Sequence, residues 1–142
     1  MSETQPQVGD WVVLYGSLMR RLGAMEGLGV GGQLRFVGPC VLTGELFDLG
    51  DYPGMRHGDG RVIAELYALL DVDVIDALDE FEHYKASERR ESLYLRERVA
   101  LLEPPETRAW IYVYNDVPDA STRIVSGDWR AHVAERARDR NP

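Results

Sequence analysis

One stretch in the middle of the chain, residues 72–102, constrains the fold most, because it passes from a helical pattern to a strand pattern. Its first part places apolar side chains at helical spacing, at Val74, Ile75, Leu78 and Phe81. This spacing predicts a short amphipathic helix that is capped by Asp71 or Asp73 and ends near Glu82. After a polar loop, side chains alternate with a period of two from Leu93 to Leu102, which predicts a β-strand.

Strand patterns occur on both sides of this helix. Short runs rich in apolar and β-branched residues predict strands at residues 11–15, 61–70 and 107–115. Residues 33–49 are predicted to be two strands or one long bent strand, with bends or bulges at Gly38-Pro39 and Gly44. The glycine-rich residues 48–60 are predicted to be a loop, and residues 107–115 form a hairpin with the strand that starts at Leu93.

These elements together predict an α+β fold, in which flanking helices cover a small mixed, strongly bent sheet or barrel of five to six strands. A weak helix is predicted within residues 18–29, and a polar helix at residues 129–140 has Asp128 as its cap. The length of 142 residues predicts a single domain over residues 10–140, and residues 1–9 are predicted to be a flexible N-terminus.

Charge and composition exclude several classes of protein. The net charge is -8, and the basic residues are scattered among acids, so we expect no nucleic-acid partner. No apolar run approaches the roughly 20 residues that span a bilayer, and the N-terminus lacks the pattern of a secretion signal. We therefore expect a cytoplasmic protein without a membrane partner. The single cysteine, Cys40, excludes an internal disulfide and any zinc site built on paired cysteines.

Glu82 is the candidate for chemistry. The neighbouring acids on the predicted helix are expected to lie on its solvent face, whereas Glu82 borders the apolar stripe one turn after Leu78. A carboxyl group there is partly desolvated, which raises its pKa toward the range of a general base near neutral pH. A second candidate feature is the turn Tyr15-Gly16-Ser17-Leu18, where a glycine after a buried strand lets main-chain N–H groups face a carboxylate or an oxyanion.

Other chemistry is less favoured by the residues. An EF-hand is excluded because Asp76 stands where the calcium loop needs glycine, and the three histidines form no ligand pair, so no metal site is expected. Cys40 lies in an apolar run and is interpreted as a core residue rather than a nucleophile. Ser17 lacks the Gly-x-Ser-x-Gly pattern of a nucleophilic serine.

Several short motifs occur in an order that is specific to one family. They are Tyr15-Gly16-Ser17-Leu18, the run from Gly44 to Pro53, Val62 to Tyr67, Leu78-Asp79-Glu80-Phe81-Glu82, Tyr94-Leu95-Arg96 with Val99, Ala109 to Tyr114, and Ser126-Gly127-Asp128-Trp129. With these motifs the chain resembles the γ-glutamylcyclotransferase-like family, including its γ-glutamylamine cyclotransferase and plant AIG2-like branches. The resemblance covers residues 12–130.

The resemblance implies a small mixed barrel with flanking helices and a pocket at one end. The family's catalytic glutamate, in the pattern Leu-Asp-x-x-Glu, corresponds to Glu82. Its substrate-holding loop corresponds to Tyr15, Gly16, Ser17 and Leu18, and its pocket tyrosines to Tyr94 and Tyr112. Many members have glycine after the glutamate, whereas this chain has His83, which is expected to narrow the pocket or reshape the loop.

The implied activity is that of a γ-glutamylcyclotransferase-like enzyme, of acyltransferase or cyclising lyase type. It converts a γ-glutamyl amine or amino acid into 5-oxoproline and a free amine, with Glu82 as general acid and base and without a metal or other cofactor. The expected partner is a small-molecule γ-glutamyl substrate, and the protein is expected to be a monomer or a weak homodimer. The alternatives are a non-catalytic binding or regulatory module that uses the same pocket, and a thiol hydrolase built on Cys40 and a histidine.

Overall fold

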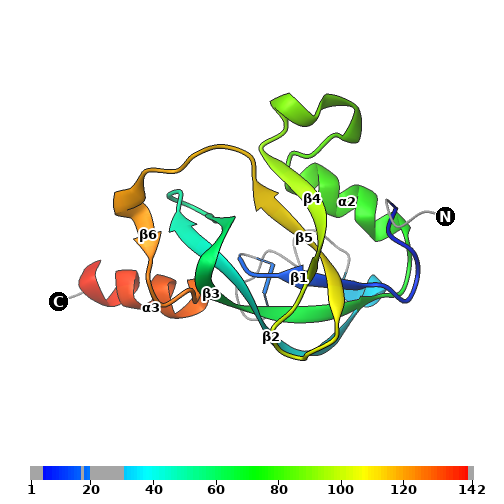
Figure 1. The fold of residues 1–142 in the computed structure, drawn as a ribbon, viewed down its shortest axis with the longest axis horizontal. Coiled ribbons are helices and arrows are strands. Elements are labelled where there is room, and N and C mark those ends of the chain that lie inside the picture. The colour runs from blue at the N-terminus through cyan, green and yellow to red at the C-terminus, as the bar shows by residue number, and fades with distance from the viewer. Residues whose placement is uncertain (1–4, 17, 20–30, 141–142) are drawn as a thin grey trace.

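A six-stranded mixed sheet forms the centre of the computed structural model, which describes residues 5–16, 18–19 and 31–140. Its strands are β1 (Trp11–Leu14), β2 (Leu34–Asp48), β3 (Pro53–Leu69), β4 (Tyr94–Ala100), β5 (Arg108–Tyr114) and β6 (Arg123–Ile124). They lie in the order β4-β5-β1-β3-β2-β6 (Figure 1), and the sheet is not closed. The predicted α+β class and strand number are confirmed, and of the two predicted forms the sheet is the open one.

Helices lie at two separate ends of this sheet (Figure 1). Helix α2 (Asp73–Phe81) lies beside β4 and β5, whereas α3 (Trp129–Arg140) lies near β6 at the other end. Short 3-10 turns are formed by Gly31–Gln33, Ala86–Glu91 and Ala120–Thr122. Within the described parts of the chain, no helix has the length and apolar character needed to cross a membrane. The weak helix predicted at residues 18–29 falls almost wholly outside the described residues.

The direction of the strands brings four strand ends to one place. β1 is parallel to β5, and it is antiparallel to β3, while β4 is antiparallel to β5. β1 and β5 therefore end at the same edge of the sheet at which β3 and β4 begin. This arrangement gathers residues 15–16, 18–19, 53–55, 94 and 112–114, which come from segments far apart in the sequence.

The β2–β3 ribbon is the longest element of the fold, and it contains one correction to the sequence-based prediction. Register shifts between Phe36 and Gly38 and between Thr43 and Glu45 confirm the two predicted irregularities. Residues 53–60, however, belong to β3, so the prediction of a loop over residues 48–60 is wrong; only residues 49–52 turn the chain. The glycines in this segment permit close packing instead: a Cβ atom on Gly58 would lie 2.6 Å from the Glu45 side chain.

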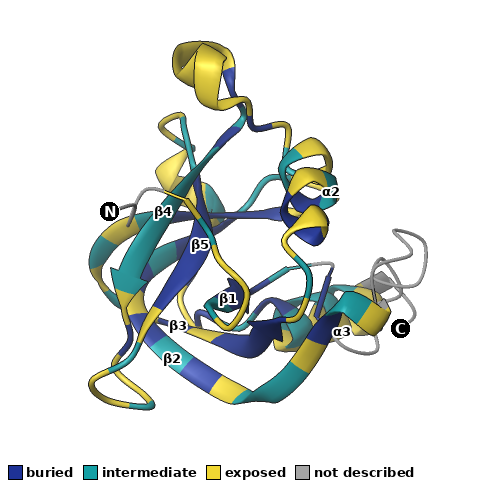
Figure 2. Ribbon diagram, turned by 90° about the vertical axis from the view of Figure 1, so that its right-hand side faces the viewer, coloured by how far each residue is buried: buried dark blue, intermediate teal, exposed yellow. Residues whose placement is uncertain are grey.

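The core lies against the central strands, as the dark blue segments of β5, β1 and α2 in Figure 2 show. On α2, Val74, Ile75 and Leu78 are buried as the helical spacing predicts. Phe81 is the exception, because this residue is 39% exposed and lines a cavity. The apolar stripe of this helix therefore ends one turn earlier than the sequence indicates.

Polar contacts fix the residues before β1 and the start of α3. The Gly9 N–H donates to the Leu69 carbonyl at 2.9 Å, so part of the segment predicted as a flexible N-terminus contacts β3. At the other end the Ala131 N–H donates to Asp128 Oδ1 at 3.2 Å, which is the predicted cap of α3.

The packing of Gly127 against β3 can be tested by substitution. Its φ is +68°, a Cβ atom there would lie 1.8 Å from the Arg61 carbonyl oxygen, and its own carbonyl accepts the Ile63 N–H at 2.8 Å. We expect Gly127→Ala to lower the free energy of unfolding by roughly 3 kcal/mol or more, through left-handed strain and a main-chain clash. Denaturant unfolding measures this loss. Gly38→Ala is the control, because a Cβ atom on Gly38 meets no atom within 4 Å, and an equal loss in both variants contradicts the assignment.

Candidate functional site

A cavity of about 270 Å³ opens where the four strand ends meet the C-terminal end of α2. The predicted site residues that the structure describes all line it: Glu82, Tyr15, Gly16, Leu18, Tyr94 and Tyr112. Ser17 lies outside the described residues. The structure thus brings an acid from a helix end and the exit of the first strand to one cavity.

The end of α2 fixes the direction in which Glu82 points. The Glu82 N–H donates to the Leu78 carbonyl at 2.9 Å, which completes the last helical turn. The next two N–H groups then fold back, with His83 donating to the Glu80 carbonyl at 3.1 Å and Tyr84 to the Asp79 carbonyl at 2.8 Å. This pair of bonds is a Schellman motif, in which the residue after the C-cap takes a left-handed conformation.

His83 occupies that left-handed position, with a φ of +54°. Glycine is the usual residue there because it lacks the Cβ atom that crowds the backbone at positive φ. The positive φ at this position therefore explains the glycine that the family resemblance implies there. In this chain the histidine takes the same turn, and its side chain lies at the cavity wall.

Burial governs the charge state of Glu82. The residue as a whole is half-buried, but its carboxyl group is withdrawn from bulk water, and this desolvation raises the pKa of Glu82 to about 8. The partial negative charge at the C-terminal end of α2 disfavours a carboxylate in the same direction. At neutral pH the free protein therefore holds Glu82 mostly protonated and able to lose its proton when a cation binds.

The exit of β1 forms another part of the cavity wall. The Met19 N–H donates to the Gly16 carbonyl at 2.9 Å, which joins these two residues after β1. A Cβ atom on Gly16 would lie 2.9 Å from Pro53 Cγ, so this position needs glycine to let the turn pack against the start of β3. No hydrogen bond joins the Gly16 or Leu18 N–H to another residue in the described part of the chain.

The three tyrosines at the cavity are fixed by hydrogen bonds within the protein. The Tyr15 hydroxyl donates to the Tyr112 carbonyl at 2.7 Å and accepts the Met55 N–H at 3.2 Å. The Tyr94 hydroxyl donates to the Pro53 carbonyl, and the Tyr112 hydroxyl donates to Asp79 Oδ1 at 2.6 Å. Burial raises the pKa of all three phenols, so they stay neutral. Their protons are therefore engaged, and they shape the cavity walls.

The alternative of a cysteine nucleophile is disfavoured by the structure. Cys40 is buried on β2, does not line the cavity, and has its pKa raised to about 12, first by burial and then by the nearby Glu65. A nucleophilic cysteine needs the opposite shift, because the thiolate is the reactive form. Among the residues that the structure describes, no three His, Cys, Asp or Glu side chains gather as a metal site would require.

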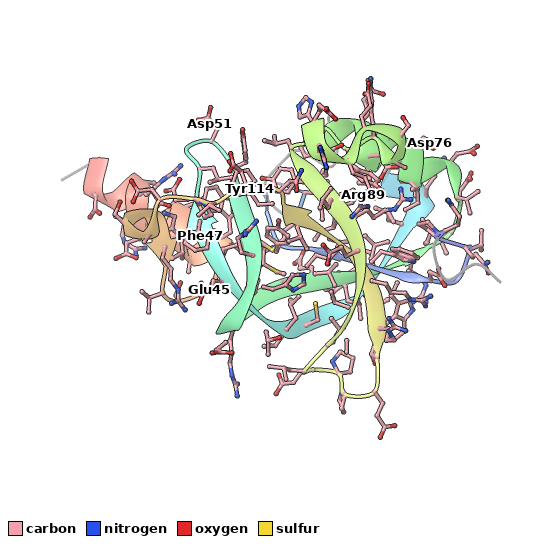
Figure 3. The ribbon with its side chains drawn as sticks, turned by 45° about the horizontal axis from the view of Figure 1, so that its top comes forward. Glu45, Phe47, Asp51, Asp76, Arg89 and Tyr114 are labelled. Atoms are coloured by element: carbon pink, nitrogen blue, oxygen red, sulfur yellow. The ribbon has the colours of Figure 1, made fainter. Side chains whose placement is uncertain are left out.

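Several cavity residues were missed by the sequence analysis: Asp51, Tyr52, Pro53, Phe81 and Leu93 line the cavity beside the predicted set and His83. Asp51 lies at the tip of the turn between β2 and β3 (Figure 3). Asp51 to Pro53 were interpreted as parts of a loop, and only the resemblance motif that ends at Pro53 marks this turn for function.

Comparisons with known proteins identify the family of the chain. The sequence profile described as Gamma-glutamyl cyclotransferase, AIG2-like matches residues 12–131. The chain belongs to this family. The family protein YtfP of Escherichia coli is 33% identical over 119 residues, which cover 83% of this chain and 94% of YtfP. The corresponding protein of Citrobacter rodentium is 35% identical over 125 residues, covering 83% and 93%.

The fold is also found in solved structures. A crystal structure of an uncharacterized protein from Pyrococcus horikoshii matches 93% of this chain and 98% of its own, with a TM-score of 0.69 and 19% identity. At this identity the match shows the fold alone. Membership of the γ-glutamyl cyclotransferase, AIG2-like family therefore rests on the sequence matches.

The left-handed conformation of residue 83 can be tested by comparing the stability of two variants. We expect His83→Gly to be about 1 kcal/mol more stable than His83→Ala, because both remove the imidazole but only glycine relieves the strain at positive φ. Thermal and denaturant unfolding of the two variants measure the difference. If the alanine variant is as stable as the glycine variant, residue 83 does not hold the left-handed position of a Schellman motif.

Proposed function

We propose that this protein is a γ-glutamylcyclotransferase-like enzyme that converts a γ-glutamyl amine or γ-glutamyl amino acid into 5-oxoproline and a free amine. The observation that carries the proposal is the desolvated carboxyl group of Glu82, which lines the same cavity as the exit of β1. Membership of the family supports the reaction class. The substrate is a small molecule, and 5-oxoproline is small enough for a cavity of about 270 Å³.

The proposed reaction is an internal aminolysis. The α-amino nitrogen of the γ-glutamyl group attacks its own γ-carbonyl carbon, a C–N bond forms to close a five-membered lactam, and the original amide C–N bond breaks. The attacking nitrogen enters as an ammonium group and gives up two protons, and the departing nitrogen leaves as an ammonium group with two protons gained. No water and no external nucleophile is consumed.

Glu82 has the properties of the group that moves a proton between these two nitrogens. The incoming ammonium group favours the carboxylate form of Glu82 through its charge, so the side chain loses its own proton on binding. The carboxylate then accepts a proton from the attacking nitrogen and returns one to the departing nitrogen. A positioned acid and base of this kind contributes roughly 10²–10⁴-fold to the rate.

The turn after β1 is the proposed holder of negative charge. The N–H groups of Gly16, Ser17 and Leu18 are proposed to bind the substrate's α-carboxylate or the developing oxyanion, as main-chain donors do in other acyl-transfer sites. Tyr15, Tyr94 and Tyr112 are proposed to bind the substrate through ring contacts, since their hydroxyl protons are engaged within the protein. Holding the glutamyl chain in a curled form brings the attacking nitrogen close to the carbonyl carbon.

Replacing the carboxyl group tests the chemical role of Glu82. We expect Glu82→Gln to fold and to bind 5-oxoproline in calorimetry, but to release 5-oxoproline from γ-glutamyl amines and dipeptides roughly 10²–10⁴-fold more slowly than the parent. Glu80→Gln is the matched control, because Glu80 is an exposed acid on the same helix that does not line the cavity.

Two results would contradict this proposal in different ways. Undiminished turnover by Glu82→Gln removes Glu82 from the mechanism. A parent protein that binds γ-glutamyl compounds but releases no 5-oxoproline from any of them supports the alternative, a non-catalytic binding or regulatory module that uses the same pocket.

The raised pKa of Glu82 also predicts a pH profile. Since the free enzyme must present the carboxylate to an ammonium substrate, kcat/KM is expected to rise with pH through a pKa of about 8. It should fall again where the substrate's own ammonium group loses its proton. Initial rates of 5-oxoproline release between pH 5 and pH 10 measure the profile, and a rising limb near pH 4 to 5 would mean that the carboxyl group is not desolvated.

A further inference from the structure

A charged pair joins the helix that carries Glu82 to the sheet. Asp79, on the last turn of α2, accepts a charge-assisted hydrogen bond from Arg96 of β4 through Oδ2. Its other carboxylate oxygen, Oδ1, accepts the Tyr112 hydroxyl of β5 at 2.6 Å. The Arg96 side chain is 6% exposed and the Asp79 side chain 20%, so this pair is largely withdrawn from water. The two motifs Leu78–Glu82 and Tyr94–Arg96 thus meet in space, although 17 residues separate Asp79 from Arg96.

The same pair is tied to the motif that ends the helix. The guanidinium of Arg96 lies over the ring of Tyr84, 5.1 Å from its centroid, and 5.8 Å from the centroid of Trp110. Tyr84 is the residue whose N–H donates to the Asp79 carbonyl and closes the Schellman motif. Residues of β4 and β5 therefore hold the side chain of Asp79, and the Tyr84 N–H holds its main-chain carbonyl. Glu82 lies between Asp79 and Tyr84 in the sequence.

We propose that Asp79 and Arg96 are positioning residues for Glu82, and that together they hold the end of α2 so that the Glu82 carboxyl group faces the cavity. This inference rests on the proposed function, because it assigns the pair to the acid and base of that reaction. Neither residue touches the substrate. The pair acts in two ways. The contact between Asp79 and Arg96 fixes the end of the helix, and the positive charge of Arg96 cancels the negative charge of Asp79, which is one helical turn from Glu82.

A merely structural ion pair would behave differently from a positioning pair. Removing either partner of a buried pair destabilises a protein, and that loss has the same sign for both partners. The electrostatic effect on Glu82 has opposite signs. Without Arg96, the uncancelled Asp79 carboxylate disfavours the Glu82 carboxylate; without a charge on Asp79, the uncancelled Arg96 favours it.

Other groups around Glu82 must be held constant in this comparison. The titratable side chains that line its cavity are Tyr15, Asp51, Tyr52, His83, Tyr94 and Tyr112. The variants below leave all of them in place. Tyr112 keeps a hydrogen-bond acceptor in Asp79→Asn, because the amide oxygen of asparagine can replace Oδ1.

The test measures kcat, KM and the pH dependence of 5-oxoproline release for Asp79→Asn, Arg96→Met and the double variant. We expect kcat to fall about tenfold or more in each single variant while KM changes less than about threefold. A displaced carboxyl group is misaligned with the reacting nitrogens, which slows the chemical step more than it weakens substrate binding. The rising limb of kcat/KM should move to higher pH in Arg96→Met, to lower pH in Asp79→Asn, and back toward the parent position in the double variant.

Arg98→Met is the matched control. Arg98 lies on the same face of β4 and also over the Trp110 ring, at 5.5 Å, but it pairs with Asp10 rather than with α2. We expect it to lose stability without a shift in the pH limb. If both single variants of the Asp79–Arg96 pair leave the limb unmoved, or move it in the same direction, the pair is structural only and the proposal is overturned.

A titration that needs no turnover separates this proposal from the proposed function. The Glu82 carboxyl carbon can be followed by NMR in ¹³C-labelled protein, with Glu82→Gln to assign its signal. Opposite displacements of its midpoint in Asp79→Asn and Arg96→Met support the positioning role even if the parent releases no 5-oxoproline. Equal midpoints in both variants and the parent overturn it, whatever the activity.

Discussion

Removal of a single carboxyl group from water, at the C-terminal end of α2, is the interaction on which the rest of the site depends. A carboxylate in that position is disfavoured twice, by lost hydration and by the partial negative charge of the helix end. The fold tolerates this because Glu82 can stay protonated, with its pKa raised to about 8. The same cost that makes the position unfavourable for an ordinary surface acid makes it suitable for an acid that must gain and lose a proton near neutral pH.

The sheet supplies the other half of the site through its topology. β1 and β5 are parallel neighbours, so they end together, and β3 and β4 begin at the same edge. The hydrogen bond from the Tyr94 hydroxyl to the Pro53 carbonyl joins β4 to the start of β3. The Tyr15 hydroxyl joins the exit of β1 to β5 through the Tyr112 carbonyl and to β3 through the Met55 N–H. The tyrosines therefore contribute to the site mainly as fixed walls, and Glu82 is the group that we propose to move a proton.

How much of the fold and of the site can be predicted from the sequence depends on how far apart in the sequence the interacting residues lie. The helix that ends at Glu82, the β4–β5 hairpin and the bulges near Gly38 and Gly44 are governed by local periodicity and local breaks, and all were predicted. Residues 53–60 were missed because glycine signals a turn in isolation, whereas here it lets the Glu45 side chain approach the backbone. The contact of Arg96 with Asp79 and the exposure of Phe81 depend on how α2 lies against the sheet, which no local pattern encodes. Family motifs marked Tyr94 and Tyr112 as pocket residues, but the partners of their hydroxyl groups came only from the three-dimensional arrangement.

We propose that Glu82 and the turn after β1 act on one small molecule within one cavity. A crystal structure of the protein with 5-oxoproline bound is the most direct test. We expect the lactam ring within the cavity, its ring nitrogen within hydrogen-bond distance of the Glu82 carboxyl group, and its carboxylate facing the N–H groups of Gly16 to Leu18. A ligand found elsewhere, or one that lies in the cavity with Glu82 turned toward bulk water, would contradict the claim.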